Sequence, residues 1–323
     1  MILVTGGTGF IGRALIRHLV ETDHQVRTLI RPSPVSPNLP RGVPIEVAVS
    51  GLEDERSLRA AMVGVDTIYH LASGEWRGVR TDLLTTDIQG TQSVLQAAQE
   101  AGVKRFFYLS HLGADRASAF PVLKAKAIAE EHIRRSGLEY TILRSGIVFG
   151  PTDHFTTGLV SILAAFPFFF IVPGEGDTLL QPIWVEDLVT CLVWALENIE
   201  TQNQTLSVGG PEFLSIRQIM EIIMQESGIH RKLAYLSPPY LRGLTVFLEH
   251  NFPELPVSVF WLDYLATSRT ASLDTLPRVF NLLPARFSHH LAYLKGKQWR
   301  VSLWRYLLRR QPRQPMIKQS KNT

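Results

Sequence analysis

The sequence predicts an α/β protein: a doubly wound parallel sheet with a smaller C-terminal substrate or cap region and a basic tail. Three observations predict this fold: a glycine-rich turn between the first strand and the first helix, a regular alternation of apolar strands with amphipathic helices, and an excess of basic residues near the C-terminal end. Strands that alternate with helices at this spacing pair in parallel through right-handed crossovers. A chain of 323 residues can bury the core that such a sheet requires.

The glycine-rich turn follows an apolar run at residues 2–4. Glycine permits a positive φ in the turn, close approach of a pyrophosphate to the backbone, and tight contact between helix and strand. The helix that follows offers unpaired N–H groups and the positive end of its dipole. The pattern predicts a dinucleotide site in a Rossmann-type domain, with a purely structural turn as the alternative. The residues expected to contact the cofactor here are Gly6, Thr8, Gly9, Phe10, Ile11 and Gly12.

Hydrophobic periodicity places further strands at residues 25–30, 45–49, 66–71 and 105–110. It places helices after the glycine turn, from near residue 52, and at about residues 84–101. Ligands of doubly wound sheets bind beyond the carboxyl ends of the strands. The candidate positions after the glycine turn are therefore Arg31, Leu71, Ala72, Ser73, Ser110 and His111.

Arg31 bears on which dinucleotide binds. NAD-preferring sites usually carry a carboxylate about 20 residues beyond the glycine turn, where it holds the ribose hydroxyls. A guanidinium at that point suits a 2′-phosphate instead. The sequence therefore favours NADP(H), with NAD(H) as the alternative and a solvated strand-end arginine as the structural interpretation.

The charge distribution and the cysteine content indicate the environment in which the protein is located. The net charge is +4, but the eleven basic residues after Asp274 have no acidic residue among them, so the preceding part is net acidic. Cys191 is the single cysteine, which excludes an internal disulfide and favours a reducing compartment. Because the first strand begins at residue 2, the expected location is the cytoplasm, with peripheral association at a membrane as a further expectation.

Several segments together resemble the extended short-chain dehydrogenase/reductases of the NAD(P)-dependent epimerase/dehydratase superfamily. They are TGGTGFIG at 5–12, DTIYHLA at 66–72, DIQGT at 87–91, GVKRFFYLS at 102–110 and GLEYTILRSGIVFGP at 137–151. QPIWVEDL at 181–188 resembles the segment with which that family returns to the sheet. The resemblance covers about residues 1–225 and adds Ser145 and Ile147 to the expected cofactor contacts.

The resemblance implies a catalytic pair that this chain lacks. The family places a tyrosine four residues before a lysine on one helix face, so that the lysine and the cofactor ribose lower the tyrosine pKa. Phe120 stands four residues before Lys124, and Val122 four residues before Lys126. The chain therefore resembles atypical members of the family, in the group of the complex I nucleotide-binding accessory subunit, photosystem assembly proteins and NmrA-like regulators.

The remaining catalytic candidates are Lys126, Ser110 and His111. Lys126 is the expected ribose contact, and its structural interpretation is a surface lysine paired with Glu130 at i+4. Ser110 is interpreted either as a ligand contact or as a turn residue. His111 can act as an acid or base near neutral pH, but no carboxylate is visibly paired with it in the sequence, which favours a polar rim histidine. No metal site is expected.

The predicted organisation has three parts: a cofactor-binding core at residues 1–155, a substrate or cap region at 156–290 of which about 181–210 returns to the sheet, and a basic aromatic helix and tail at 291–323. Residues 158–172 are too few to span a bilayer and contain Pro167, so we expect a helix and loop forming an apolar pocket wall, with a membrane-dipping loop as the alternative. Ser215 is the expected N-cap of the next helix. A helical segment after residue 237 is expected to cover the substrate cleft.

The aromatic and basic segment after residue 291 suits an interfacial helix on anionic lipid, or equally a helix docked on the domain with its basic face in water. No nucleic-acid recognition motif accompanies the charge, so nucleic acid is not an expected partner. Trp299, Trp304 and Tyr306 are the aromatic residues of this segment.

Three functions fit the sequence. The first is an NADP(H)-holding accessory or assembly subunit of a membrane redox or photosynthetic complex, with weak or no turnover. The second is a soluble NADPH-dependent reductase or epimerase that acts on a small apolar carbonyl substrate. The third is a cofactor-sensing regulator that binds a partner protein.

Overall fold

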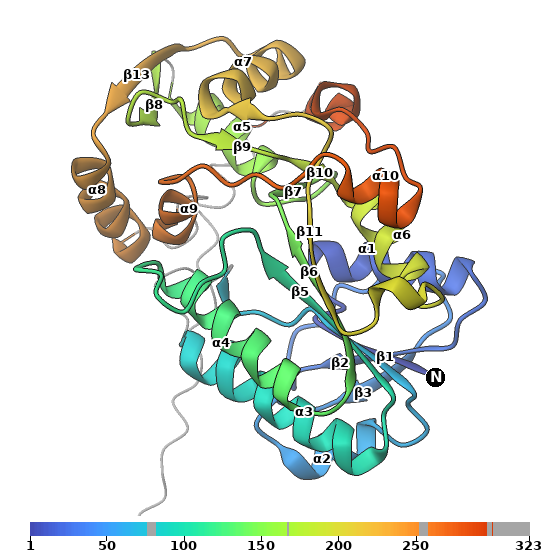
Figure 1. Cartoon of the computed structure of the whole chain (residues 1–323). Coiled ribbons are helices and arrows are strands. Elements are labelled where there is room, and N and C mark those ends of the chain that lie inside the picture. Colours follow the sequence, from blue (N-terminus) through green and yellow to red (C-terminus); the bar gives the residue numbers. More distant parts are fainter. Residues whose placement is uncertain (76–81, 167, 252–257, 296–298, 300–323) are drawn as a thin grey trace, which may run out of the picture.

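The computed structural model describes residues 1–75, 82–166, 168–251, 258–295 and 299. It confirms the predicted α/β fold (Figure 1). Within the described residues the central sheet has seven strands, all paired in parallel. In spatial order they are β11 (Gln204–Val208), β6 (Glu139–Ser145), β5 (Arg105–His111), β4 (Thr67–His70), β1 (Ile2–Thr5), β2 (Val26–Ile30) and β3 (Glu46–Val49). The order reverses between β1 and β4, the switch point at which such sheets bind ligands.

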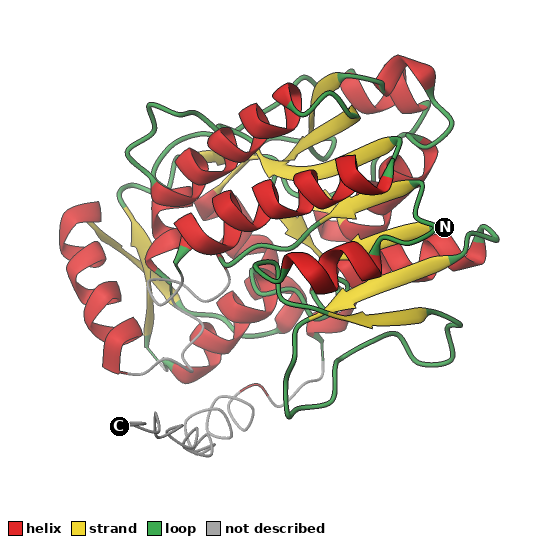
Figure 2. Ribbon diagram, turned by 90° about the horizontal axis from the view of Figure 1, so that it is seen from below, coloured by secondary structure: helices red, strands yellow, loops and turns green. Residues whose placement is uncertain are grey.

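Helices cover both faces of this sheet (Figure 2). One face carries α1 (Phe10–Glu21), α6 (Val185–Trp194) and α10 (Thr275–Phe280). The other face carries α2 (Glu55–Ala61), η2 (Leu84–Gln89), α3 (Gly90–Ala101) and α4 (Pro121–Arg135). The helix predicted at 84–101 is thus present, but its first turns are π-helical. The helix predicted from near residue 52 begins at Glu55, because the Asp54 side chain accepts the N–H of Ser57 at 3.1 Å and caps it there.

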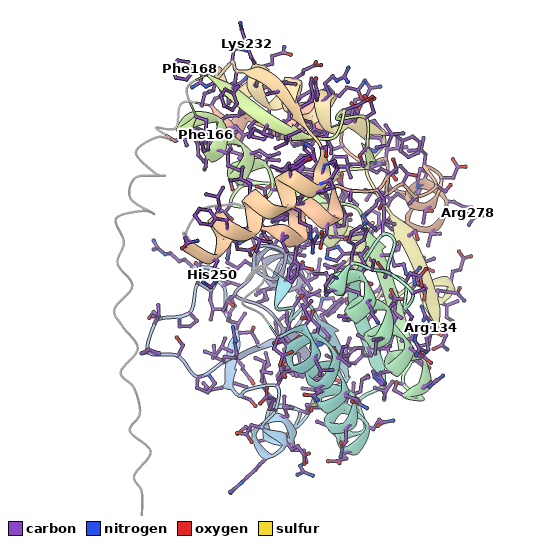
Figure 3. All side chains as sticks on the ribbon, turned by 90° about the vertical axis from the view of Figure 1, so that its left-hand side faces the viewer. Arg134, Phe166, Phe168, Lys232, His250 and Arg278 are labelled. Atoms are coloured by element: carbon purple, nitrogen blue, oxygen red, sulfur yellow. The ribbon has the colours of Figure 1, made fainter. Side chains whose placement is uncertain are left out.

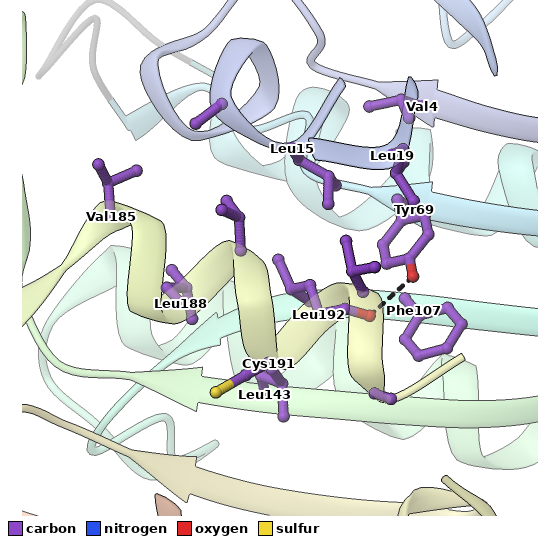
Figure 4. Packing of buried hydrophobic residues seen from close by; sticks show 14 of the residues in the cluster. Val4, Leu15, Leu19, Tyr69, Phe107, Leu143, Val185, Leu188, Cys191 and Leu192 are labelled. Atoms are coloured by element: carbon purple, nitrogen blue, oxygen red, sulfur yellow. Dashed lines mark hydrogen bonds between the residues drawn. The ribbon is translucent and has the colours of Figure 1, made fainter. Parts of the chain in front are cut away.

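The core between the sheet and the α1–α6 layer is closely packed (Figure 4). The ring of Tyr69 stacks on Phe107 with their centroids 4.5 Å apart, and its hydroxyl donates to the Leu192 carbonyl at 2.8 Å. This bond satisfies the one polar atom that Tyr69 brings into the core and ties β4 to α6. Cys191 is buried in the same helix, and burial raises the pKa of its thiol, so it acts as a packing residue.

Apart from β11, α6 and α10, most of the second half of the chain forms a region beyond the carboxyl end of the sheet, with its own apolar core (Figure 1). Its helices are α5 (Thr156–Ala165), α7 (Ile216–Ser227), α8 (Pro238–Asn251) and α9 (Val259–Tyr264). Its strands are β7 (Val148–Phe149), β8 (Phe169–Pro173), β9 (Leu179–Leu180), β10 (Ile183–Trp184), β12 (Leu214–Ser215) and β13 (Lys232–Leu236). The 3-10 helices η4 (Phe287–His290) and η5 (Ala292–Leu294) also belong to it. A third 3-10 helix, η3 (Ile199–Thr201), lies instead against the central sheet, where the Thr201 carbonyl accepts the Thr141 hydroxyl at 2.8 Å. Ser215 caps α7 in a capping box with Gln218, as its position in the sequence predicts.

One expectation for this region is corrected. Residues 158–172 form a helix followed by the strand β8, which pairs with β13, rather than a helix and a loop. Trp299 is only 8% exposed in the second core, and its indole N–H donates to the Leu294 carbonyl at 3.1 Å, which agrees with the alternative of a segment docked on the domain. Pro167 and the basic residues 300–323 lie outside the described residues. Among the described residues, no helix combines the length and apolarity needed to cross a membrane.

Candidate functional site

The glycine turn requires glycine for steric reasons. Gly6 has φ +76°, and a Cβ there would lie 2.7 Å from the Leu71 carbonyl. A Cβ on Gly12 would lie 2.3 Å from the carbonyl oxygen of Gly6, to which Gly9 donates its N–H at 2.9 Å. The turn is therefore wound so tightly against the end of β4 that side chains at Gly6 and Gly12 do not fit.

The first turn of α1 opens toward the switch point. Gly9 is its N-cap, and no side chain caps it and no acidic residue lies in its first turn. The first backbone bond of the helix runs from Arg13 to Gly9, so the N–H groups before Arg13 have no acceptor within the helix. These groups and the helix dipole are the features that hold a pyrophosphate.

The other predicted residues of the turn have packing roles as well. The Arg13 guanidinium donates to the Thr8 carbonyl at 2.7 Å and to the Thr152 hydroxyl at 2.9 Å, which fixes the turn against the loop after β7. The Phe10 ring packs on Gly150, where a Cβ would lie 3.0 Å from it. Ile11 packs against the core. The side chains of Phe10 and Ile11 are thus committed to packing, and only their backbone groups remain for a ligand.

A chain of hydrogen bonds supports the end of β4. His70 is fully buried between the hydroxyls of Thr5, at 2.8 Å from Nδ1, and Thr91, at 3.0 Å from Nε2. Burial, followed by the charge of Lys126, lowers the pKa of His70 to about 3, so the ring is neutral. Leu71, Ala72 and Ser73, which follow β4, are half-buried and border the switch point.

Asp87 is a central residue of this edge that was not among the predicted site residues. Its carboxylate accepts the Ser73 hydroxyl at 2.6 Å and the Gly74 N–H at 2.9 Å, and it lies 3.6 Å from the Nζ of Lys126. Asp87 is the first residue of the motif DIQGT, so the sequence marked this residue but did not indicate its contacts.

Lys126 lies inside the protein, on the α4 face toward the sheet edge, while Lys124 is exposed. Its Nζ is 5.2 Å from the centroid of the Tyr108 ring. Burial opposes its charge, but Tyr108, Asp87 and Glu75 outweigh burial and raise the pKa of Lys126. The lysine is therefore a buried, fixed cation. The alternative of a surface pair with Glu130 is wrong.

Ser110, which is predicted as a ligand contact or a turn residue, has an acidic partner inside the protein. Its hydroxyl donates to the fully buried Glu130 at 2.7 Å, and the same carboxylate receives Arg134 and Arg144, each at 2.7 Å. Alternation along β5 turns Ser110 toward α4 and His111 toward the other face.

The remaining predicted contacts differ in exposure. Ser145 is buried at the end of β6, and its hydroxyl lies 3.5 Å from the Ser110 carbonyl. Ile147 is part of the second core. Arg31 is exposed directly after β2.

His111 has a carboxylate partner that sequence reasoning missed. The Nε2 atom of His111 lies 2.6 Å from Oε2 of Glu75, and the His111 ring meets the edge of Tyr264 with their centroids 5.6 Å apart. Tyr264 ends α9, so the cap region brings a phenol to the edge of the sheet. Neither spacing nor composition relates Glu75 to Tyr264, and only the fold brings them together.

The cap region also contains a cavity of about 290 Å³ between the loop after β8 and the helices α8 and α9. Its walls include Pro238, Leu262 in α9 and Leu265, which directly follows α9. Among the described residues, no group of three or more His, Cys, Asp or Glu side chains is arranged to hold a metal ion.

Comparisons with known proteins agree with this geometry. Residues 6–163 match the family model described as NAD(P)H-binding. The chain is 28% identical to the mitochondrial NADH dehydrogenase [ubiquinone] 1 alpha subcomplex subunit 9 of Arabidopsis thaliana, covering 91% of this chain and 78% of that protein. It is 22% identical to the chloroplastic protein High Chlorophyll Fluorescence Phenotype 244 of the same plant, covering 85% of this chain and 67% of that one.

A solved structure shares the fold. The NADPH-dependent quinone oxidoreductase of Escherichia coli, in complex with NADPH, superimposes with a TM-score of 0.70 over 91% of this chain and 99% of that chain, at 19% identity.

Proposed function

From the premise that this chain is an atypical extended short-chain dehydrogenase/reductase with an NAD(P)H-binding domain, we propose that it holds NADP(H) as an accessory or assembly subunit of a membrane redox or photosynthetic complex, with weak or no turnover. The observation that carries the proposal is the combination of a sterically intact glycine turn with a helix that has Lys126 in place but no phenol one turn before it. The glycine turn and Lys126 support cofactor binding, whereas Val122 stands one helical turn before Lys126, where the family places its catalytic tyrosine.

The residues present fit the dinucleotide. The N-terminal N–H groups of α1 would bind the pyrophosphate, and Lys126, held as a cation by Asp87, would donate to the ribose hydroxyls. The exposed Arg31 would pair with a 2′-phosphate, which supports NADP(H) over NAD(H). When bound, the reduced nicotinamide is a hydride donor.

A surface of the cap region supports contact with an anionic membrane. Phe166, Phe168 and Phe169 are 51%, 78% and 47% exposed around the start of β8, and Arg231 and Lys232 lie beside them. Figure 3 shows Phe166, Phe168 and Lys232 at the same end of the molecule. We name these five residues the aromatic–basic patch. Aromatic rings with adjacent cations are the composition that binds an anionic lipid surface, and the basic C-terminal tail adds the same charge. The names of the two plant relatives place them in organelles, which suits a role beside membrane complexes.

Nucleotide titration tests the cofactor proposal. We expect NADPH to bind with enhanced fluorescence and to bind more tightly than NADH, and Arg31→Ser to remove most of that difference while leaving NADH affinity unchanged. Equal affinities for NADPH and NADH in the unaltered protein would refute the NADP preference, and lack of binding to either would refute the proposal itself.

A second candidate function is favoured by one observation. The His111–Glu75 pair is a carboxylate–histidine arrangement of the kind that exchanges protons, and it lies at the carboxyl end of β5. This supports an NADPH-dependent reductase acting on a small apolar carbonyl compound. Oxidation of NADPH, measured with a panel of ketones, quinones and enones, distinguishes the accessory subunit from the reductase. If none of these compounds is reduced, the accessory role is supported and the reductase is refuted.

A further inference from the structure

Two buried polar atoms at the boundary between the sheet and the cap region lack hydrogen-bond partners among the described residues. They are the Nδ1 of His111, at the end of β5, and the hydroxyl oxygen of Tyr264, at the end of α9. The two rings are in edge-to-face contact. Because buried polar groups are nearly always paired, two unpaired ones on touching rings point to a ligand atom that is shared between them.

The protonation of the cluster follows from Glu75. Burial disfavours the charge of this carboxyl, but the charge and hydrogen bond of His111 and then the charge of Lys126 outweigh burial and lower the pKa of Glu75 to about 2. An ionised carboxylate only accepts hydrogen bonds, so the Nε2 of His111 donates to it. The ring nitrogen without a partner among the described residues is then Nδ1, which donates to an oxygen atom when it carries a proton.

Tyr264 supplies the second polar atom. Its side chain is 8% exposed, and burial first, then the charge of Glu75, raises its pKa, so the hydroxyl keeps its proton. The Arg269 guanidinium lies 4.7 Å from the centroid of the Tyr264 ring and donates from Nε to the Tyr264 carbonyl at 2.9 Å. The phenol is thus held in place as a hydrogen-bond donor.

We propose that the Tyr264 hydroxyl and a protonated Nδ1 of His111 together donate hydrogen bonds to one oxygen atom of an apolar carbonyl compound, a ketone or quinone, and that Glu75 positions the imidazole. The proposal deepens the second candidate function, and it rests on the dinucleotide site only for turnover. Tyr264 of the cap region would thereby supply the phenol that the family places four residues before the lysine, where this chain has Val122.

Aromatic rings adjoin Tyr264. Trp261 lies 6.3 Å from Tyr264 between ring centroids, and Phe155 lies 5.6 Å from Trp261. The electrostatic interaction of Glu75 with Lys126 links the cluster to the expected ribose contact. If the carbonyl carbon accepted hydride from NADPH, its oxygen would gain negative charge and would take the Nδ1 proton, which would leave a neutral ring whose Nε2–H still donates to Glu75. In the reverse direction, Nδ1 takes the proton of an alcohol.

The test compares two probes of nearly the same shape, menadione and 2-methylnaphthalene, which lacks the oxygen atoms. Binding to the full-length protein is measured by calorimetry, with and without NADPH. We expect menadione to bind at least about tenfold more tightly, the effect of roughly one hydrogen bond to a charged group.

Tyr264→Phe removes only the hydroxyl and is expected to weaken menadione about tenfold while leaving 2-methylnaphthalene unchanged. Tyr240→Phe is the matched control, because Tyr240 is 75% exposed on α8. Glu75→Gln tests positioning: its amide can donate to Nε2, so the ring ¹⁵N spectrum of His111 should move toward the Nδ1–H tautomer.

Equal affinity for both probes, or an unchanged probe ratio in Tyr264→Phe, would overturn the proposal. These outcomes can be distinguished from a failure of the proposed function, because NADPH affinity is measured on the same samples. Menadione binding without NADPH binding supports this site and refutes the cofactor role. NADPH binding without menadione binding supports the cofactor role and refutes this site.

Discussion

The glycine-turn edge of the sheet and the cap region beyond it differ in how their polar side chains are paired and in how far their aromatic side chains are exposed. At the edge, Thr5, His70, Thr91, Asp87 and Ser73 form a continuous buried hydrogen-bonded chain. The cap region leaves the Tyr264 hydroxyl unpaired among the described residues and exposes the aromatic–basic patch. A fully paired network is rigid and suits a site that holds one ligand in one place. An unpaired polar group suits a site that binds a ligand, and exposed aromatic groups suit a surface that contacts a partner or a membrane.

The largest expected effect comes from breaking the glycine turn. In Gly12→Val, the Cβ would lie 2.3 Å from the carbonyl oxygen of Gly6, so the turn must open. We expect NADPH affinity to fall by more than about 100-fold, or about 2.7 kcal/mol, in fluorescence titration. Gly243→Ala is the control, because a Cβ there meets nothing within 4 Å. NADPH binding at unaltered affinity in Gly12→Val would contradict the role of the turn.

The next effect comes from Lys126. Lys126→Met leaves Asp87 as a buried carboxylate without its cation, which typically costs about 3–5 kcal/mol. We expect this loss in urea unfolding, together with weaker NADPH binding. Lys124→Met, at an exposed position of the same helix, should change neither. Similar behaviour of the two variants would show that Lys126 is not part of the edge network.

A pH dependence tests the same network. His70 has a pKa of about 3 in the folded protein against 6.5 ordinarily, so the unfolded chain binds a proton that the folded one does not between these values. Stability is therefore retained above pH 6.5 and lost as the pH falls, by about 2–3 kcal/mol between pH 6.5 and 4.5. His70→Gln should flatten this part of the stability curve measured by urea unfolding. His230→Gln, at an exposed histidine, should leave it unchanged.

Substitutions in the aromatic–basic patch are expected to have the smallest effect on stability, but to reduce binding to anionic vesicles. Phe168→Ser, at a position 78% exposed, should alter the unfolding free energy by no more than about 0.5 kcal/mol. It should reduce flotation with vesicles that contain phosphatidylserine, and more so when combined with Lys232→Gln. Leu283→Ser, 84% exposed outside the patch, is the control. Unchanged flotation of the double variant would remove the patch from the membrane proposal.

Local signals predicted the sheet edge well. The glycine turn, the strand ends after β4 and β5, and the N-cap at Ser215 depend on residues that are close together in the sequence, so their chemistry is visible there. The acceptor of Ser110, Glu130, could not be predicted because it lies on a helix whose packing decides which strand face it meets. His111 was interpreted as a rim residue because its partner Glu75 belongs to the segment after another strand.

The nucleotide-binding fold could be predicted from the amino-acid sequence, because glycine positions and strand periodicity are local properties of the chain. The surroundings of the carboxyl ends of the strands depend on tertiary packing. Asp87 meets Lys126 because α4 packs beside η2, and Tyr264 meets His111 because the cap region folds over the end of β5. Such contacts join residues far apart in the chain, and no spacing rule relates them.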